Sequence, residues 1–283
     1  MIKEYNLNFY GSSSTTTDRD LYEKYVDQMY QIAIDCGLFT RVEKVKPEEP
    51  PETNPYEAYR VSAYIDDIEV IRFDLTGAPV VFSGSPGTRS LQHHRLTAYY
   101  NNGQNSYSIR PITDNFNSTV GMGFRKAYVT NNGILIRIRE YYASSYGSTI
   151  NAYGTAMISR SNKRYPIVIG PIGSGNYTSN TRHDTTSCHK YDVLSVCYAD
   201  EGYMLSGGYY SNARLIYQYA ATAKQTMLFP FIAYGAPNYD CTYSKYACWM
   251  PFTSNSIRNG GLQKVLVNGK EYVTDGYFAL RDD

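Results

Sequence analysis

The chain has 283 residues, with 27 Lys and Arg against 26 Asp and Glu, which gives a formal net charge of +1. A neutral chain without a run of basic residues lacks the charge that nucleic-acid binding needs, so no nucleic-acid partner is expected. The N-terminal residues lack the apolar core of a signal peptide. No stretch approaches the roughly eighteen uninterrupted apolar residues of a membrane span, so we expect a soluble product, synthesised in the cytoplasm, with no membrane span.

One helix is predicted, and it covers residues 18–36. Its apolar side chains recur at spacings of three and four residues, which is the pattern of an amphipathic helix; they are Leu21, Tyr22, Tyr25, Val26, Met29, Ile32, Ala33 and Cys36. Either Thr17 or Asp18 is expected to cap the first amides, and Gly37 stands where a left-handed residue commonly ends a helix.

Four strands are predicted around this helix, at residues 5–10, 39–45, 58–65 and 69–75, and a tight polar turn at 66–68 makes a hairpin of the last two. Residues 46–55 hold four prolines and three glutamates, so they are expected to form an exposed, extended loop. Residues 1–76 are therefore predicted to be a small α+β region, with one amphipathic helix on an antiparallel sheet.

From residue 77 to 283 the pattern changes to short apolar or alternating runs separated by Gly, Pro, Asn and Ser. Strands are predicted at 80–82, 95–100, 106–110, 134–141, 153–159, 167–169, 193–198, 214–219 and 227–234. Many short strands with turn signals between them predict an antiparallel β-sandwich or barrel. A half-buried strand is predicted to follow the turn Asn131-Asn132-Gly133, because Ile134, Ile136 and Ile138 alternate with Leu135, Arg137 and Arg139. The fold class is therefore mainly β.

Tyrosine is unusually abundant, with 31 residues against 10 Phe and one Trp. Tyr141, Tyr142, Tyr209 and Tyr210 stand among Ser, Gly, Asn and Ala. Tyrosine combines a stiff apolar ring with a polar tip, and small polar neighbours adapt easily to a partner. These residues are candidate ligand or interface contacts, and the chain is expected to act by binding.

The only tryptophan, Trp249, lies in a segment with Tyr243, Tyr246, Asp240 and Lys245. Aromatic rings beside polar groups can stack on sugars, so this segment is a candidate ligand platform. The alternative, which we favour, is that Trp249 and Met250 fill the core of the β domain.

The cysteines and histidines do not form a recognisable chemical motif. Cys188 and Cys197, or Cys241 and Cys248, either form disulfides across hairpins or remain thiols, and buried thiols are the default. His183 and His189 lie near Cys188, but the ligand spacing is wrong for a zinc knuckle. His93-His94 and His183-Asp184 are expected at the surface or in turns. Asp66-Asp67 and Asp282-Asp283 are interpreted as turn and tail charges, and the glycines at 170–175 as a loop. We therefore predict no enzyme activity, catalytic residue, cofactor or metal.

The C-terminal segment, residues 264–273, places Asn268-Gly269 between two strand-like arms, which is the strongest short hairpin signal. A last strand follows at 277–281. This ending, with Asn-Gly-Lys-Glu-Tyr and a final Leu-Arg, resembles the ends of structural proteins of tailed bacteriophages and phage-tail-like particles. The resemblance covers about the last twenty residues.

The resemblance implies a non-enzymatic structural subunit of a virion, in the tail, baseplate, neck or head surface. Its partners would be other virion structural proteins and copies of itself. The C-terminal hairpin would either complete a sheet within the subunit or add to the edge of a neighbour. The alternative function is a receptor- or carbohydrate-binding module of the same particle, with host surface glycan as the ligand. A hydrolase with scattered catalytic residues is a weaker third hypothesis.

Overall fold

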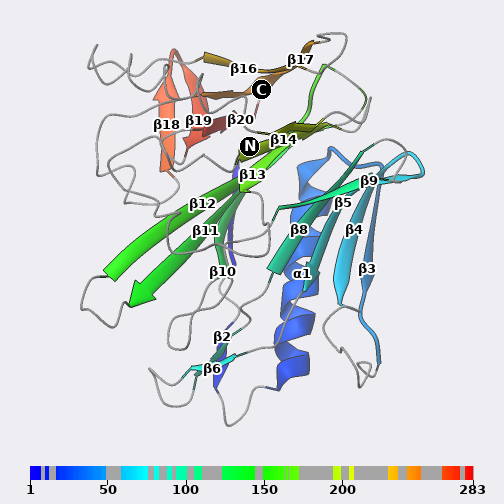
Figure 1. Ribbon diagram of the computed structural model, residues 1–283, viewed down its shortest axis with the longest axis vertical. Helices are drawn as coiled ribbons and strands as arrows, with labels where there is room; N and C mark the ends of the chain where they lie inside the picture. Colours follow the sequence, from blue (N-terminus) through cyan, green and yellow to red (C-terminus); the bar gives the residue numbers. More distant parts are fainter. Residues whose placement is uncertain are drawn as a thin grey trace.

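A computed structural model describes the chain over residues 1–7, 10–12, 17–48, 59–75, 80–82, 88–90, 94–100, 105–109, 123–143, 149–162, 164, 166–171, 194–198, 204–206, 229–234, 241–249, 263–274 and 278–282. In these residues the fold is mainly β, with antiparallel sheets and one helix, α1 (Asp18–Cys36) (Figure 1). None of the described sheets closes on itself, so the predicted sandwich or barrel is not confirmed.

Helix α1 has the predicted bounds and the predicted ends. The Thr17 hydroxyl accepts the amide of Asp20 at 3.2 Å, while the Asp20 carboxylate accepts the Thr17 amide at 2.7 Å, so the two residues form a capping box. Gly37 adopts a φ of 62°, and its amide donates to the carbonyl of Ile34. Thr17 rather than Asp18 is therefore the N-cap.

The N-terminal sheet has the strand order β3-β4-β5-β8-β9. Its strands are β3 (Arg41–Val45), β4 (Arg60–Ile65), β5 (Ile68–Leu75), β8 (His94–Tyr100) and β9 (Asn105–Ile109). The predicted hairpin is confirmed, with a turn at Asp66-Asp67 in which Asp66 has a φ of 54°. Of the predicted loop 46–55, residues 46–48 contain no helix or strand, and the others lie outside the described residues.

The central sheet has the order β1-β10-β11-β12-β13-β14-β15. Its strands are β1 (Lys3–Asn6), β10 (Gly123–Thr130), β11 (Gly133–Ala143), β12 (Thr149–Ser159), β13 (Ile167–Pro171), β14 (Leu194–Tyr198) and β15 (Met204–Ser206). The predicted turn at Asn131-Asn132 joins β10 to β11. The predicted strand 5–10 is divided between β1, which pairs with β10, and β2 (Tyr10–Ser12). The segment was predicted to belong to the sheet formed with residues 39–75, and this was wrong because β1 pairs with β10, more than a hundred residues away.

A small sheet contains β2, β7 (Thr88–Ser90) and β6 (Val80–Phe82), in the order β2-β7-β6. The C-terminal sheet has the order β16-β17-β20-β19-β18. Its strands are β16 (Phe229–Tyr234), β17 (Cys241–Trp249), β18 (Gln263–Val267), β19 (Lys270–Thr274) and β20 (Phe278–Arg281). Asn268 and Gly269 have φ values of 52° and 77°, so the predicted hairpin and its turn are confirmed. The predicted strand 214–219 lies outside the described residues.

The main core lies between the N-terminal and central sheets, with α1 in contact with both. The helix contacts β3 and β4 on one side and β10 and β11 on the other (Figure 1). Core side chains therefore come from both sides of residue 76, for example Phe73 and Ile136. The division into domains at residue 76 stays a prediction.

The C-terminal sheet packs on the other face of the central sheet, where β17 contacts β12 and β13, and β20 contacts β11. At the start of β11, Ile134, Leu135 and Ile136 are all fully buried. The prediction of a half-buried strand was wrong for these residues, because α1 covers one face and the C-terminal sheet covers the other.

Candidate binding surface on the C-terminal sheet

The segment that contains the predicted platform forms strand β17, which has a bulge. Phe231 pairs with Ser244, but the preceding residue of β16, Pro230, pairs with Cys248. Three residues of β17 therefore lie between positions that are adjacent on β16. Pro230 has no amide hydrogen to give to a ladder, and β16 is an outer strand of the described sheet, where proline and irregular pairing are tolerated.

Ser244 holds the bulge from inside. Its hydroxyl oxygen accepts the amides of Tyr246 at 3.1 Å and Ala247 at 3.2 Å, and lies 2.7 Å from the hydroxyl oxygen of Ser159. Ser244 is 3% exposed and Ser159 is fully buried. Because buried hydroxyls are costly when unpaired, these bonds fix both the turn of the bulge and its position on β12.

Asn162 fixes the start of the bulge. Its side-chain oxygen accepts the amide of Tyr243 at 2.8 Å, and its backbone amide donates to the Tyr243 carbonyl at 2.9 Å. This reciprocal pair links β17 to the segment that follows β12. The backbone of the bulge is thus attached to the central sheet at both Tyr243 and Ser244.

The bulge presents three side chains outward: Tyr243, Lys245 and Tyr246, which we call the bulge surface. Tyr243 is 46% exposed, Lys245 is exposed, and Tyr246 is half-buried. The Lys245 amine lies 5.3 Å from the centre of the Tyr246 ring, which is the range of a cation–π contact. The bulge surface combines aromatic area with positive charge on a fixed backbone.

Trp249 ends β17. Its backbone position pairs with Phe229 on one side and Phe278 on the other, so three aromatic residues lie in one row across three strands. This register is compatible with Trp249 packing in the core and with Trp249 forming a ligand platform, because one face of the sheet points to the core and the other points outward. The choice between packing and platform stays a prediction.

The other predicted contact residues do not join the bulge surface. Tyr141 and Tyr142 lie near the far end of β11, paired with Asn151 and Ile150. Tyr141 is eight residues from Gly133, roughly 26 Å along the strand, whereas Gly133 adjoins Leu280 of the C-terminal sheet. Tyr209 and Tyr210 lie outside the described residues.

The suggested disulfide between Cys241 and Cys248 is excluded by the pairing of β17. Their partners, Tyr234 and Pro230, are four residues apart on β16, which is roughly 13 Å at the rise of a strand. A disulfide needs α-carbons within about 7 Å. The two cysteines lie along one strand rather than across a hairpin. Cys188 lies outside the described residues, so the Cys188–Cys197 alternative stays a prediction.

The described thiols are not poised for nucleophilic chemistry. Burial raises the pKa of Cys248 to about 12, although the nearby Arg281 lowers it. Burial likewise raises the pKa of Cys36 to about 12. Both thiols stay protonated near neutral pH, whereas a reactive cysteine needs its thiolate.

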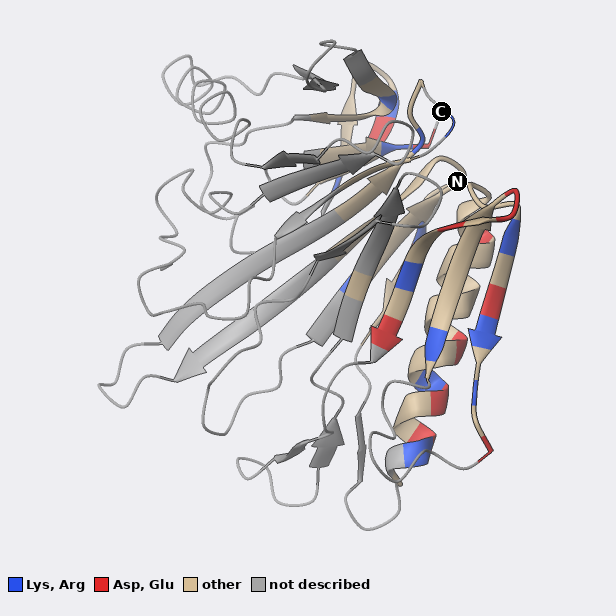
Figure 2. Cartoon of the chain, turned by 45° about the vertical axis from the view of Figure 1, so that its right-hand side comes forward, with Lys and Arg blue, Asp and Glu red and all other residues tan. Residues whose placement is uncertain are grey.

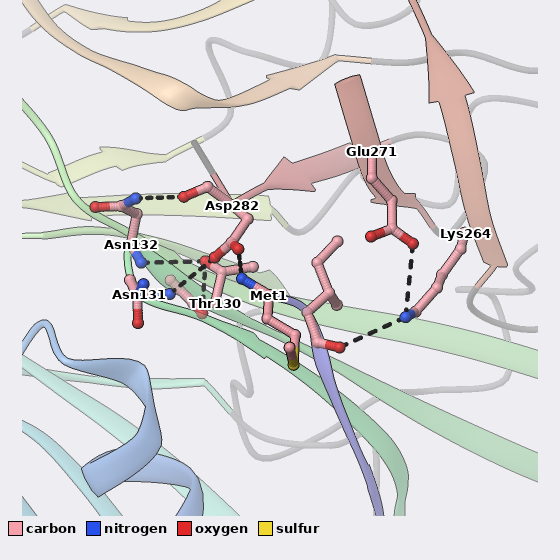
Figure 3. Close-up of polar contacts among 9 residues, drawn as sticks. Met1, Thr130, Asn131, Asn132, Lys264, Glu271 and Asp282 are labelled. Carbon is pink, nitrogen blue, oxygen red and sulfur yellow. Dashed lines mark hydrogen bonds and ion pairs between the residues drawn. The ribbon is translucent and has the colours of Figure 1, made fainter. Parts of the chain in front are cut away.

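Asp282 was interpreted as a tail charge, but its side chain is largely buried at a junction of several segments (Figure 3). Its carboxylate pairs with the Met1 ammonium and accepts the Asn131 amide at 3.3 Å, while its carbonyl accepts the Asn132 side chain at 2.8 Å. Arg160 extends the junction by donating to the Asn132 side-chain oxygen at 3.0 Å and to the Gly37 carbonyl at 3.4 Å. The interpretation was wrong because the β10–β11 turn lies next to the end of β20.

The remaining chemical candidates are spread over the chain. Asp66 lies in the β4–β5 turn, as predicted, and pairs with Arg164. His94 begins β8, while His93, His183, Asp184 and His189 lie outside the described residues. Within the described ranges, no group of three or more His, Cys, Asp or Glu side chains could hold a metal ion. The helix that the structure describes is not long and apolar enough to cross a membrane.

Sequence reasoning missed Ser159, Asn162 and Ser244, which position the bulge surface. Serine and asparagine in a β-rich sequence give no signal of a long-range contact. Pro230 was a usable signal, because proline within a predicted strand marks an edge or a bulge.

Comparisons of the chain with protein-family models, with curated proteins and with solved structures found no match.

Proposed function

We propose that this protein is a non-enzymatic structural subunit of a phage virion or phage-tail-like particle, located in the tail, baseplate, neck or head surface. It acts by contacts with other virion structural proteins and with copies of itself. The resemblance of its last twenty residues supports the class of particle, and the confirmed β18–β19 hairpin is the structural part of that resemblance.

The observation that carries the binding role is the bulge surface. Tyr243 is 46% exposed although the backbone on which it stands is fixed by Asn162 and Ser244. A side chain on a fixed backbone loses little conformational entropy when a partner covers it, so its buried area contributes more to affinity. Tyrosine is also enriched among the residues that dominate protein–protein contacts.

Open antiparallel sheets fit a role in assembly. The outer strands of the described sheets have backbone groups that another chain can pair with. The packing of the C-terminal sheet on the central sheet supports our interpretation of the β-rich region as a sandwich. In this interpretation the bulge surface lies on the outer layer, where a neighbour can reach it.

The alternative function, a glycan-binding module of the same particle, is favoured by one specific contact. The Lys245 amine lies over the Tyr246 ring, on the same bulge as the exposed Tyr243. A sugar can stack on a tyrosine ring while an amine takes its hydroxyls. Trp249 would extend this platform if its side chain lies on the same face.

The first test of the proposal, which we call the particle test, measures the protein composition of purified particles. Particles purified from a lysate of the host would be separated by density and their proteins quantified by mass spectrometry. The proposal expects the chain in a fixed ratio to the known structural proteins, and particles from a gene deletion should be incomplete by electron microscopy. A chain that is absent from purified particles would contradict the proposal.

The surface test uses two pairs of variants expressed in trans with the deletion. Tyr243→Ser is matched by Ile34→Ser, because both native side chains are 46% exposed, and Lys245→Glu is matched by Lys24→Glu on the exposed side of α1. We expect the two β17 variants to reduce complete particles at least about tenfold, while the two helix variants complement. Equal complementation by all four would exclude the bulge surface as an assembly contact.

Light scattering of the purified chain with host cell-wall glycan separates the two functions. Stoichiometric binding that Trp249→Ala or Tyr243→Ser abolishes would favour the receptor-binding alternative. A mass that does not change with glycan favours the structural role.

A further inference from the structure

The two outer strands β3 and β18 differ in how they are protected against pairing with another chain. Strand β3 carries charges of both signs (Figure 2). Arg41 pairs with Glu43, and Lys44 pairs with Asp27 of α1. Charged outer strands resist pairing with another chain. Strand β18 carries Val265, Leu266 and Val267, and Leu266 is 74% exposed. Among the described strands, β18 pairs with β19 alone.

The geometry of the hairpin fixes which backbone groups of β18 point outward. The turn at Asn268-Gly269 makes Val267 and Lys270 a hydrogen-bonded pair, because the first and last residues of such a turn are bonded. Hydrogen-bonded pairs alternate along an antiparallel ladder, so Val265 also points its backbone groups at β19. The amide and carbonyl groups of Lys264 and Leu266 therefore point away from the sheet.

We propose that β18 pairs antiparallel with β18 of a second copy of this chain, across a two-fold axis at Val265. In this register Lys264 of each copy lies opposite Leu266 of the other, and the outward groups of both residues form backbone hydrogen bonds across the axis. The two C-terminal sheets then form one continuous antiparallel sheet. Such an interface uses the same patch on both subunits, as two-fold symmetry requires.

The side chains in this register complement each other. Leu266 would pack on the aliphatic stem of Lys264 from the second copy, and the amine of that lysine would extend toward Glu271, which lies opposite Leu266 on β19. Lys264 already lies 3.6 Å from Glu271 within one chain and 3.5 Å from the Ile2 carbonyl (Figure 3). The same lysine and glutamate thus provide complementary charges on both sides of the axis.

A neighbouring register does not work. An axis at Leu266 would pair Lys264 with Asn268 of the second copy, but Asn268 has a φ of 52° and belongs to the turn. A residue in this left-handed conformation cannot continue a strand ladder. The axis at Val265 is therefore the register that uses both outward residues.

The inference rests on the proposed function only in assuming that copies of the chain meet, and it adds the strand by which they bind. The first test is the mass of the full chain by sedimentation and light scattering, over a range from micromolar to several hundred micromolar. Leu266→Pro removes an outward amide without removing a β18–β19 bond, and Leu266→Lys adds a charge. Val45→Lys on β3 is the matched control, because Val45 is also an exposed apolar residue on an outer strand.

We expect a dimer for the native chain and for Val45→Lys, and a dissociation constant raised at least about tenfold for both Leu266 variants. Circular dichroism and thermal melting establish that each variant is folded. A native chain that stays monomeric at every concentration, or folded Leu266 variants that dimerise as well as the native chain, would overturn the inference. The particle test decides the proposed function independently, so the two failures are distinguishable.

Cross-linking tests the register. Val265→Cys places two thiols across the axis at a non-hydrogen-bonded pair, where α-carbons are about 4.5 Å apart and a disulfide can form. Leu266→Cys places its thiols diagonally, where they are too far apart. Peptide mapping of Val265→Cys by mass spectrometry should find the two copies linked to each other through position 265. A link in Leu266→Cys and none in Val265→Cys would contradict the proposed axis.

Discussion

The hydroxyl oxygens of Ser159 and Ser244 lie 2.7 Å apart and join the central sheet to the C-terminal sheet. Both side chains are buried, but they differ in what else they bond. Ser244 also accepts the amides of Tyr246 and Ala247, whereas Ser159 donates to the Arg160 carbonyl at 3.3 Å. The bulge therefore depends on Ser244 for two backbone bonds and on Ser159 for none.

Ser244→Ala is expected to lower the free energy of unfolding by about 1–3 kcal/mol, because it leaves the two amides without their acceptor and removes the bond to Ser159. Ser159→Ala should cost less, since the bulge keeps its internal bonds. Urea unfolding of both variants and of the double variant gives the coupling between them. A Ser159 variant that loses more stability than the Ser244 variant would contradict this assignment.

Gly133→Ala is expected to destabilise the fold by about 2–3 kcal/mol. A β-carbon there would overlap the Ile158 carbonyl oxygen and lie 2.8 Å from a Leu280 methyl group and 3.2 Å from the Ser159 α-carbon. Two of these three neighbours are backbone atoms, which cannot rotate away.

Gly269→Ala is the control for Gly133→Ala. No described atom lies within 4 Å of a β-carbon at Gly269, so this variant bears only the cost of a φ of 77°, about 1–2 kcal/mol. Thermal unfolding compares the two. If the loss at Gly133 did not exceed the loss at Gly269, crowding of the added β-carbon by β12 and Leu280 would not be the cause.

Thr17→Ala is expected to cost about 1 kcal/mol, because it removes the acceptor for the Asp20 amide at the start of α1. Thr17→Ser keeps the hydroxyl and should retain most of the stability. Urea unfolding followed by circular dichroism measures both. An alanine variant as stable as the serine variant would show that the Thr17 hydroxyl does not contribute.

Stability should fall in alkali partly because of Tyr128. Burial raises the pKa of Tyr128 to about 12 from its ordinary value of 10.0, and the hydrogen bond to Glu4 acts in the same direction. A group whose pKa is raised by folding stabilises the protein fully below its unfolded pKa, and this contribution is lost as the pH rises through the folded value. The loss is therefore expected between pH 10.0 and about pH 12.

Tyr128→Phe should flatten the dependence of unfolding free energy on pH in this window, while lowering stability at about pH 8 through the lost bond to Glu4. Cys36 and Cys248 also have raised pKa values, but they contribute equally to the pH dependence of the native protein and of Tyr128→Phe. Urea unfolding at about pH 8, 10 and 11 gives the comparison. Parallel curves for the two chains would assign the alkaline loss to other groups.

Local signals predicted the elements better than their arrangement. The spacing of apolar residues, Thr17 and Gly37 predicted α1, and Asn268-Gly269 predicted the C-terminal hairpin, because each signal acts within a few residues. The pairing of β1 with β10 joins residues more than a hundred positions apart. No local pattern determines such a pairing, which explains why strand 5–10 was assigned to the wrong sheet.

The candidate site was predicted only in part, because composition is a local signal and the contacts that anchor the site are long-range. Composition indicated Tyr243 and Tyr246 as contact residues, and the structure adds that Tyr243 is exposed and Tyr246 half-buried. The anchors Ser159 and Asn162 lie more than eighty residues earlier in the chain. The alternative of a Cys241–Cys248 disulfide across a hairpin failed because both cysteines lie in one strand, β17, with a bulge rather than a turn between them.

The position of α1 between two sheets determines which apolar surface is exposed while the chain is being synthesised. The ribosome completes α1 and strands β3 to β5 well before β10 and β11, which cover the other side of the helix. Until those strands emerge, the side of α1 that they cover stays exposed, and a nascent chain in this state is prone to aggregation. We therefore expect the yield of this protein to depend on translation speed and chaperone supply as well as on its stability.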